Sequence, residues 1–180
     1  MKRLAAFTLI ELMIVIAIVG IISMIAAPSF RTYISNSTAN KLSSQVMIDI
    51  MYTRNLAITN ERTARMIPTD ATPGGGTLAG GGGVDWAAGW QVVDVGPPQV
   101  VMRTSSGGGV NAQIRSIDNA NVLDRANPVE FDANGFAVRQ GTIAVGVLGC
   151  AGDNAQTIRI NQIGQIIATD IDCPVAFAGL

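Results

Sequence analysis

The strongest constraint on this chain is an uncharged, apolar run near its N-terminus. Between Glu11 and Arg31 lie 19 residues without a charge, LMIVIAIVGIISMIAAPSF. At about 1.5 Å per residue, a helix of this length spans roughly 28 Å, close to the ~30 Å hydrocarbon core of a bilayer. The short basic segment MKRLAA before it favours a cytoplasmic N-terminus. The sequence therefore predicts a single membrane-spanning helix, with most of the chain on the far side of the membrane.

The composition excludes several kinds of chemistry. The chain has 180 residues, no histidine and a formal net charge of -1. Without histidine there is no Ser-His-Asp or Cys-His catalysis and no imidazole ligand for zinc. The nearly neutral charge gives no general attraction to nucleic acid. We therefore expect a protein that is not an enzyme and that binds no cofactor or metal.

The residues before the apolar run have an unusual order. In an ordinary signal peptide the small residues of the cleavage site follow the apolar region, whereas here Ala5 and Ala6 precede it. With Lys2 and Arg3 in the leader, the FTLIE that follows Ala6 and the later Pro28, this segment resembles the class III leader of type IV pilins and type II secretion pseudopilins.

That resemblance implies a processing site and a layout of the chain. A prepilin peptidase would cleave between Ala6 and Phe7 and methylate the new amine of Phe7. The family usually has glycine before the cut, so Ala6 implies slower processing. Residues 1–6 would be the leader, 7–30 the transmembrane and assembly helix, and 31–180 a periplasmic head. The protein would lie in the bacterial inner membrane with a single pass and then enter a pilus or pseudopilus.

Glu11 is the one carboxylate at the edge of the apolar run. Ionisable groups inside a membrane are costly and usually mark function, with a partner close by. In a pilin-like filament the partner would be the ammonium of Phe7, on a neighbouring subunit or on the same chain. Glu11 would then favour docking of subunits in register. The alternative is a carboxylate that extends to the cytoplasmic interface.

Helical periodicity continues beyond the apolar run. A stripe at steps of three and four predicts one helix from about residue 7 to 60, whose second half packs on a sheet. Polar residues, among them Asp49, lie off this stripe. Gly20 and Pro28 are positions where the helix is expected to bend. The stripe consists of Ala39, Leu42, Val46, Ile50, Thr53 and Ala57.

After the helix the pattern changes to strands. Strand-like segments are expected at 63–68, 89–95, 99–103, 129–131, 136–140, 142–149, 157–161 and 165–170, with hairpin turns at DANG and at Ile163-Gly164. The segments TPGGGTLAGGGGVD and SSGGG are expected to be surface loops, and neither has the features of a P-loop. The predicted fold class is α+β: a long N-terminal helix packed on a mostly antiparallel sheet.

Cys150 and Cys173 are the only cysteines, and both follow the membrane segment. Outside the cytoplasm disulfides persist, so a structural disulfide is expected. Asp170 and Asp172 alternate along a strand or turn and would share one face; a solvated surface is the simpler interpretation, and a calcium site the alternative. Trp86 and Trp90 are expected to be core aromatics.

The head also resembles GspH/FimT-type minor pilins and pseudopilins. The matching segments are DWAAGWQVV, VEFDANGFAV and RINQIGQI, with a partial match at the helix end, where Thr53-Arg54 precedes NLAI. Three functions follow from this resemblance. The first is a minor pilin that helps to initiate or cap a type IV pilus, with other minor and major pilins as partners. The second is the GspH-like pseudopilin of a type II secretion system. The third is a FimT-like tip pilin that binds DNA, which Gln165 disfavours because it replaces the arginine of that family's Gly-Arg turn.

Overall fold

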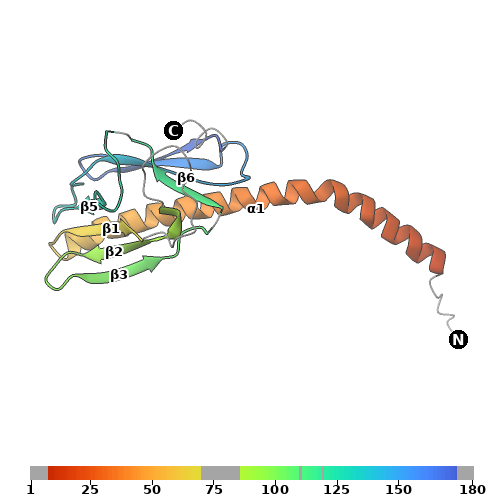
Figure 1. Ribbon diagram of the computed structural model, residues 1–180, viewed down its shortest axis with the longest axis horizontal. Helices are drawn as coiled ribbons and strands as arrows, with labels where there is room; N and C mark the ends of the chain where they lie inside the picture. The colour runs from red at the N-terminus through yellow and green to blue at the C-terminus, as the bar shows by residue number, and fades with distance from the viewer. Residues whose placement is uncertain (1–7, 70–85, 110, 119, 174–180) are drawn as a thin grey trace.

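The computed structural model describes residues 8–69, 86–109, 111–118 and 120–173. Its longest element is α1, Leu9–Thr59. Thr8 is the N-cap of this helix and Asn60 its C-cap, so the predicted bounds of 7 and 60 are confirmed to within two residues. The first half of α1 extends away from the head, and the second half lies within it (Figure 1). The predicted cleavage site at Ala6 and Phe7 lies outside the described residues, as does the glycine-rich segment 72–85.

The described residues of the head form eight strands in two four-stranded sheets, and all the strand pairs are antiparallel. A short 3-10 helix, η1 (Trp86–Ala88), precedes the second strand. The first sheet has the order β3-β2-β1-β5 and consists of β1 Ala64–Pro68, β2 Trp90–Asp94, β3 Val100–Ser105 and β5 Val129–Phe131. The second has the order β4-β6-β7-β8 and consists of β4 Ala112–Ser116, β6 Gly141–Val147, β7 Ala155–Ile160 and β8 Ile166–Ile171.

The α+β class is confirmed, but the expectation of one sheet was wrong. The two sheets lie on opposite sides of the second half of α1 (Figure 1). Two strands also differ from the sequence prediction. Segment 136–140 forms only a single bridge, from Ala137 to Phe131, and the Ala137 N–H instead donates to the Gln162 carbonyl of the last hairpin. Strand β4 was not predicted, since AQIRS is too short and too polar to show a clear alternation.

The core is built around the predicted apolar stripe of α1. All six of its residues are buried. They pack against inward-facing residues of both sheets, such as Met66 and Val92 from the first and Ile143 and Ile158 from the second. Burying these side chains in one cluster stabilises the head by roughly 25 cal/mol for each Å² of apolar surface removed from water.

Two hairpin turns meet beside the C-terminal part of α1. The DANG turn is closed by the hydrogen bond from the Gly135 N–H to the Asp132 carbonyl, and Gly135 has a φ of 79°. Gly164 in the last hairpin lies so close to the Gly135 carbonyl that a Cβ there would collide with it. Arg54 of α1 donates through Nε to the same carbonyl at 2.9 Å. These contacts hold the helix and both turns together. The sequence predicted the two hairpins but not the contact between them.

The loop after β3 is also packed rather than free. A Cβ at Gly108 would overlap the side chains of Leu42 and Ala112, so this glycine permits close approach of the loop to α1. The SSGGG segment, residues 105–109, therefore contacts α1 at Gly108, beside the end of β3.

Candidate assembly site

The N-terminus of α1 holds Glu11 in a local hydrogen-bond arrangement. The Thr8 backbone N–H and the Thr8 hydroxyl both donate to Glu11 Oε2 at 2.9 Å, and the Glu11 N–H donates to Thr8 Oγ1 at 3.3 Å. This is a capping box, which satisfies N–H groups that the first turn of a helix leaves unpaired. The sequence pattern of a capping box is Thr-x-x-Glu at positions 8–11, and Thr8 was not among the expected site residues. Glu11 thus has a partner on its own chain, and its pairing with the amine of Phe7 stays a prediction.

The first half of α1 is apolar on all sides. The large hydrophobic residues from Leu9 to Met24 are each more than half exposed. No single helix among the described residues is long and apolar enough to span a membrane, but the bent halves Leu9–Met24 and Ser29–Thr59 together meet that test of length and composition. A helix that is hydrophobic all round requires an apolar environment, either lipid or other helices.

The helix bends between these two halves. The angle is 47° and falls across residues 25–28, which include Pro28. The bend is visible in Figure 1 as a change in the direction of α1 outside the head. The position agrees with the expectation for Pro28, while proline as its cause stays a prediction. Gly20, the other expected bend position, lies within the first half, Leu9–Met24, and not at this break.

A buried carboxylate, Asp49, joins α1 to the first sheet. It is fully buried, although its place off the apolar stripe suggested a polar face of the helix. Its Oδ2 accepts hydrogen bonds from Trp90 Nε1 at 2.8 Å, Ser105 Oγ at 2.6 Å and Gln45 Nε2 at 3.0 Å. Arg103 of β3 completes the group, with its Nε 3.1 Å from Asp49 Oδ1. A buried charge needs such partners. They could not be recognised from the sequence, because they come from three different elements.

Arg103 connects this group to the surface. Its guanidinium also lies 5.8 Å from the centre of the Tyr52 ring, a cation–π distance. The side chain of Arg103 is 40% exposed, whereas Asp49 is sealed. Strand β3 is therefore held to the helix through both Arg103 and Ser105, which contact the same carboxylate.

Both tryptophans are buried, as expected. Trp86 and Trp90 are fully buried in the core. The Trp86 Nε1 donates to the Leu123 carbonyl at 3.0 Å. Both side chains pack in the core of the head, and the Trp90 indole N–H also donates a hydrogen bond to Asp49.

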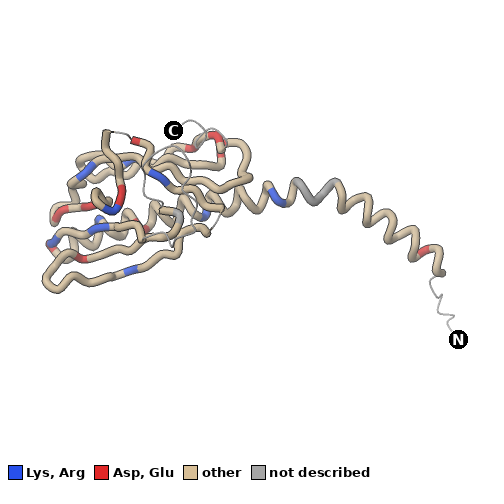
Figure 2. The backbone as a smooth tube through the Cα atoms, viewed as in Figure 1, with Lys and Arg blue, Asp and Glu red and all other residues tan. Residues whose placement is uncertain are grey.

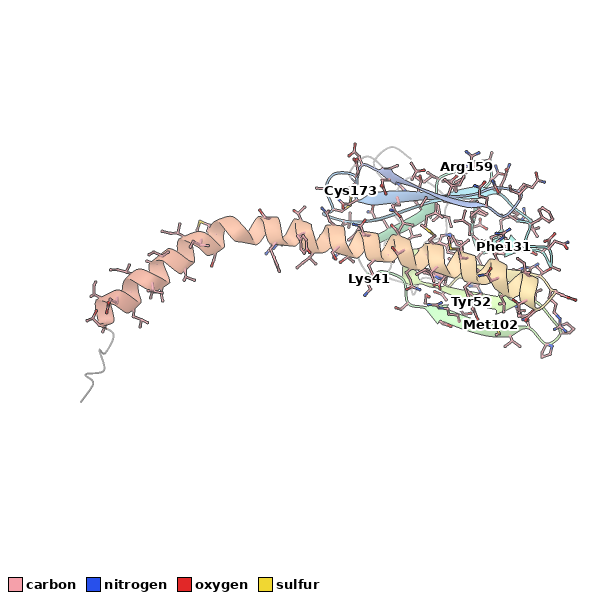
Figure 3. The ribbon with its side chains drawn as sticks, turned by 180° about the vertical axis from the view of Figure 1, so that it is seen from behind. Lys41, Tyr52, Met102, Phe131, Arg159 and Cys173 are labelled. Carbon is pink, nitrogen blue, oxygen red and sulfur yellow. A yellow bond between two sulfur atoms is a disulfide. The ribbon has the colours of Figure 1, made fainter. Side chains whose placement is uncertain are left out.

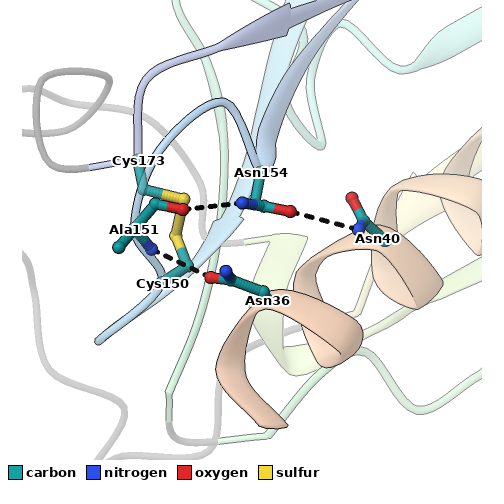
Figure 4. The surroundings of a disulfide bond; sticks show 6 residues. All are labelled: Asn36, Asn40, Cys150, Ala151, Asn154 and Cys173. Atoms are coloured by element: carbon teal, nitrogen blue, oxygen red, sulfur yellow. Dashed lines mark hydrogen bonds between the residues drawn. A yellow bond between two sulfur atoms is a disulfide. The ribbon is translucent and has the colours of Figure 1, made fainter. Parts of the chain in front are cut away.

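The expected disulfide between Cys150 and Cys173 is present, with a Cα–Cα distance of 5.6 Å. The disulfide closes a loop that is hydrogen-bonded to Asn36 and Asn40 of α1 (Figure 4). The Ala151 N–H donates to Asn36 Oδ1 at 2.9 Å, and Asn40 Nδ2 donates to Asn154 Oδ1 at 3.3 Å. The disulfide thus fixes the C-terminal part of the second sheet to the part of α1 where it enters the head.

Three carboxylates lie beside this loop. A hydrogen bond with Asp172 and the negative charge of Asp172 raise the pKa of Asp153, and the charge of Asp170 adds to the shift. Asp170 also accepts a hydrogen bond from Gln156 Nε2 at 2.8 Å. Within the described part of the chain, no three His, Cys, Asp or Glu side chains are gathered closely enough to hold a metal ion.

The last hairpin turn, at Gly164-Gln165, contains no arginine. The Gln165 N–H donates to Asn161 Oδ1 at 2.8 Å, and its side chain accepts from Asn161 Nδ2 at 3.0 Å. The cation nearest this turn is Arg54 of α1, which is half-buried and donates to the Gly135 carbonyl. Basic and acidic residues are spread over the head rather than segregated (Figure 2).

Comparison with protein families gave two matches. Residues 1–27 match the prokaryotic N-terminal methylation motif, and residues 42–164 match the model described as type II transport protein GspH. The chain is also similar to the type IV major alpha-pilin of Moraxella bovis (50% identical over 46 residues, 26% of this chain and 29% of that protein). A fimbrial protein of Pseudomonas aeruginosa is 46% identical over 46 residues, 26% of this chain and 30% of that protein. These matches therefore span less than a third of the length of the curated relatives.

Comparison with solved structures gave matches to a minor pilin. The type IV minor pilin FimU of Pseudomonas aeruginosa aligns with a TM-score of 0.49 and 16% sequence identity, over 75% of this chain and 87% of that chain.

Proposed function

Because this chain belongs to the GspH family, we propose that it is a minor subunit of a type IV pilus that helps to initiate or cap its assembly. The subunit docks through α1, whose exposed apolar half packs among the helices of neighbouring subunits. Its partners are other minor and major pilins or pseudopilins, and the head contacts neighbouring heads. The observation that supports this proposal most directly is the N-terminal methylation motif over residues 1–27, which includes the apolar start of α1 with Glu11 in its first turn.

The same proposal includes the processing and location of the chain. A prepilin peptidase removes residues 1–6 and methylates Phe7, residues 7–30 span the inner membrane once, and residues 31–180 form a periplasmic head. The disulfide between Cys150 and Cys173 is consistent with an oxidising compartment for the head. Mass spectrometry of the mature protein tests the processing. N-methyl-phenylalanine at the new N-terminus is expected, and an intact Met1 would contradict the proposal.

The role of Glu11 needs a test that separates docking from helix capping. Glu11→Ala removes the carboxylate and the capping box together, whereas Thr8→Ala removes the hydroxyl of the cap and keeps the charge. If Glu11 pairs with the amine of Phe7 during docking, Glu11→Ala should strongly reduce incorporation into sheared filaments while Thr8→Ala reduces it little. Equal loss in the two variants would assign Glu11 to capping alone. Membrane insertion of each variant, measured by fractionation, is the control.

A second candidate function is that of a pseudopilin in a type II secretion system, which the name of the matching family favours. The physical role of the subunit is the same and only the machine differs. Deletion of the gene separates the two: loss of twitching with normal enzyme secretion supports the pilus, and the reverse result supports the secretion system. The third function, DNA binding at a filament tip, is disfavoured by Gln165. Sub-micromolar, salt-sensitive binding in a gel-shift assay of the full-length protein in detergent would overturn that view.

A further inference from the structure

Strand β3 is an edge strand of the first sheet in the part of the chain that the structure describes. Among the described strands it pairs only with β2, so its other side presents unpaired backbone N–H and carbonyl groups. Its apolar residues are also exposed: Val100 by 45%, Val101 by 51% and Met102 by 44%. An exposed apolar edge strand is a ready template for another strand, and natural proteins usually shield such edges. This edge therefore has the properties of an interaction surface.

A basic, hydroxyl-rich cleft continues this edge. It has a volume of about 440 Å³ and lies between α1 and the end of β3. Lys41 and Arg103 supply positive charge, and Thr104, Ser105 and Ser106 contribute polar lining. Because Arg103 is already paired with Asp49, Lys41 is the cation at this cleft that is available to an acidic partner. The β3 surface, meaning Val100–Ser105 together with this cleft, thus combines an apolar strand edge with positive charge at one end.

The complementary features lie on the opposite side of the head. Strand β8 is the edge of the second sheet and pairs only with β7 among the described strands. It exposes Ile167 by 42% and carries Asp170, with Asp172 directly after it. Figure 3 shows the two sheets on either side of α1, with Met102 on β3 at one side and Arg159 on β7, next to β8, at the other. One copy of the chain therefore presents an apolar edge with a basic end on one side and an apolar edge with an acidic end on the other.

The directions of the two edges also agree. Strand β3 begins shortly after Gly96, which lies against Arg62 near the C-terminal end of α1. It ends at Ser105, which donates a hydrogen bond to Asp49, nearer the N-terminal side of the head. Strand β8 begins shortly after Gly164, which lies beside Arg54 of α1. It ends beside the disulfide loop, where Asn154 accepts a hydrogen bond from Asn40 of α1. Both strands thus run opposite to α1. In two copies whose helices point the same way, the β3 edge of one and the β8 edge of the other would be parallel.

We propose that the β3 surface binds the β8 edge of a second copy of this chain, with Lys41 facing Asp170 and Asp172. Lys41 and Asp172 lie at a similar height along α1, because Asn40 contacts Asn154 and the Cys173 N–H donates to the Gly152 carbonyl. The contact joins two different surfaces, so a pair of copies keeps one β3 surface and one β8 edge free for other subunits of the filament. The inference rests on the proposed function, because the α1 helices of two subunits point the same way when both subunits are anchored in the same membrane.

Cysteine cross-linking in the full-length chain tests this contact. Cells carry two forms of the protein, one with Met102→Cys and the other with Ile167→Cys or Ala168→Cys, which sample both faces of β8. The control replaces the β8 cysteine with Tyr33→Cys, at a residue that is 69% exposed and belongs to α1, outside both edge strands. After oxidation, the β3–β8 pairs are expected to give a cross-linked dimer, and the control pair is not.

Charge variants then test the basic end. Lys41→Glu should reduce the cross-linked yield by about tenfold, because an attraction at contact distance becomes a repulsion. Asp172→Lys in the partner copy should restore much of that yield, which a general effect on folding would not do. A yield that is unchanged by Lys41→Glu, or not restored by Asp172→Lys, would refute the assigned charge pairing.

The outcomes also separate this inference from the proposed function. If the chain is cleaved and found in sheared filaments but neither β3–β8 pair cross-links, the docking inference is wrong and the filament function stands. If the pairs cross-link but the chain is absent from filaments, the function is wrong and the contact stands. Failure of both measurements refutes both.

Discussion

Asp49 gives the sharpest test of how the head is held together, because its carboxylate is fully buried and contacted from three elements. In Asp49→Ala the buried Trp90 N–H loses its acceptor. A hydrogen bond to a charged group is worth about 1.5–3 kcal/mol. Loss of the ion pair with the partly exposed Arg103 adds about 0.5 kcal/mol. The higher helix propensity of alanine returns about 0.5 kcal/mol.

The net destabilisation expected for Asp49→Ala is about 2 kcal/mol, since Gln45 and Ser105 are half-buried and can turn to water. For a chain of this size that corresponds to a fall in Tm of roughly 4–8 °C. The assay is thermal unfolding of the full-length protein in detergent micelles, followed by circular dichroism. Ser105→Ala is the matched control, because it removes one donor and leaves the carboxylate paired; it should cost about 1 kcal/mol or less.

A double-mutant cycle tests the cause. Trp90→Phe removes the indole donor, so Asp49→Ala should cost about 1–2 kcal/mol less in that background than in the parent. Strict additivity of the two variants would show that the hydrogen bond of 2.8 Å contributes nothing. A change in Tm of less than about 1 °C for Asp49→Ala alone would refute the whole account of the buried group.

Other predictions concern the second sheet. Replacing Cys150 and Cys173 by serine should destabilise the head by roughly 3 kcal/mol, from the loop that the disulfide closes; unfolding with and without reductant measures this loss. The pKa of Asp153 is raised by Asp172, so the stability that proton binding contributes is present at acid pH and is lost as pH rises through the raised pKa. Asp153→Asn should therefore be more stable than the parent at pH 7, with the difference shrinking below about pH 4; a stabilisation equal at both pH values would contradict this linkage. Gly164→Ala should disturb the last hairpin, because a Cβ collides with the Gly135 carbonyl and the φ is 76°; a Tm equal to that of the parent would show that the two turns can separate at no cost.

The sequence by itself determined the parts of this protein that depend on local periodicity. The apolar run, the helical stripe from Ala39 to Ala57 and most strands follow from spacing along one segment, and each was located correctly to within a few residues. Periods of 3.6 and 2 are properties of neighbouring residues, so they are visible without a fold. The disulfide was also predictable, because only two cysteines are present and both follow the membrane segment.

Only the tertiary structure decided what joins these segments. The division of the strands into two sheets around α1, the burial of Asp49 and the approach of Gly164 to Gly135 all depend on contacts between residues far apart in the chain. A polar residue such as Asp49 looks solvent-facing in a helical pattern until its partners Trp90 and Arg103 are known. The position of a free strand edge likewise depends on which strands fail to find a neighbour. These are properties of pairing in space, which periodicity along the chain does not encode.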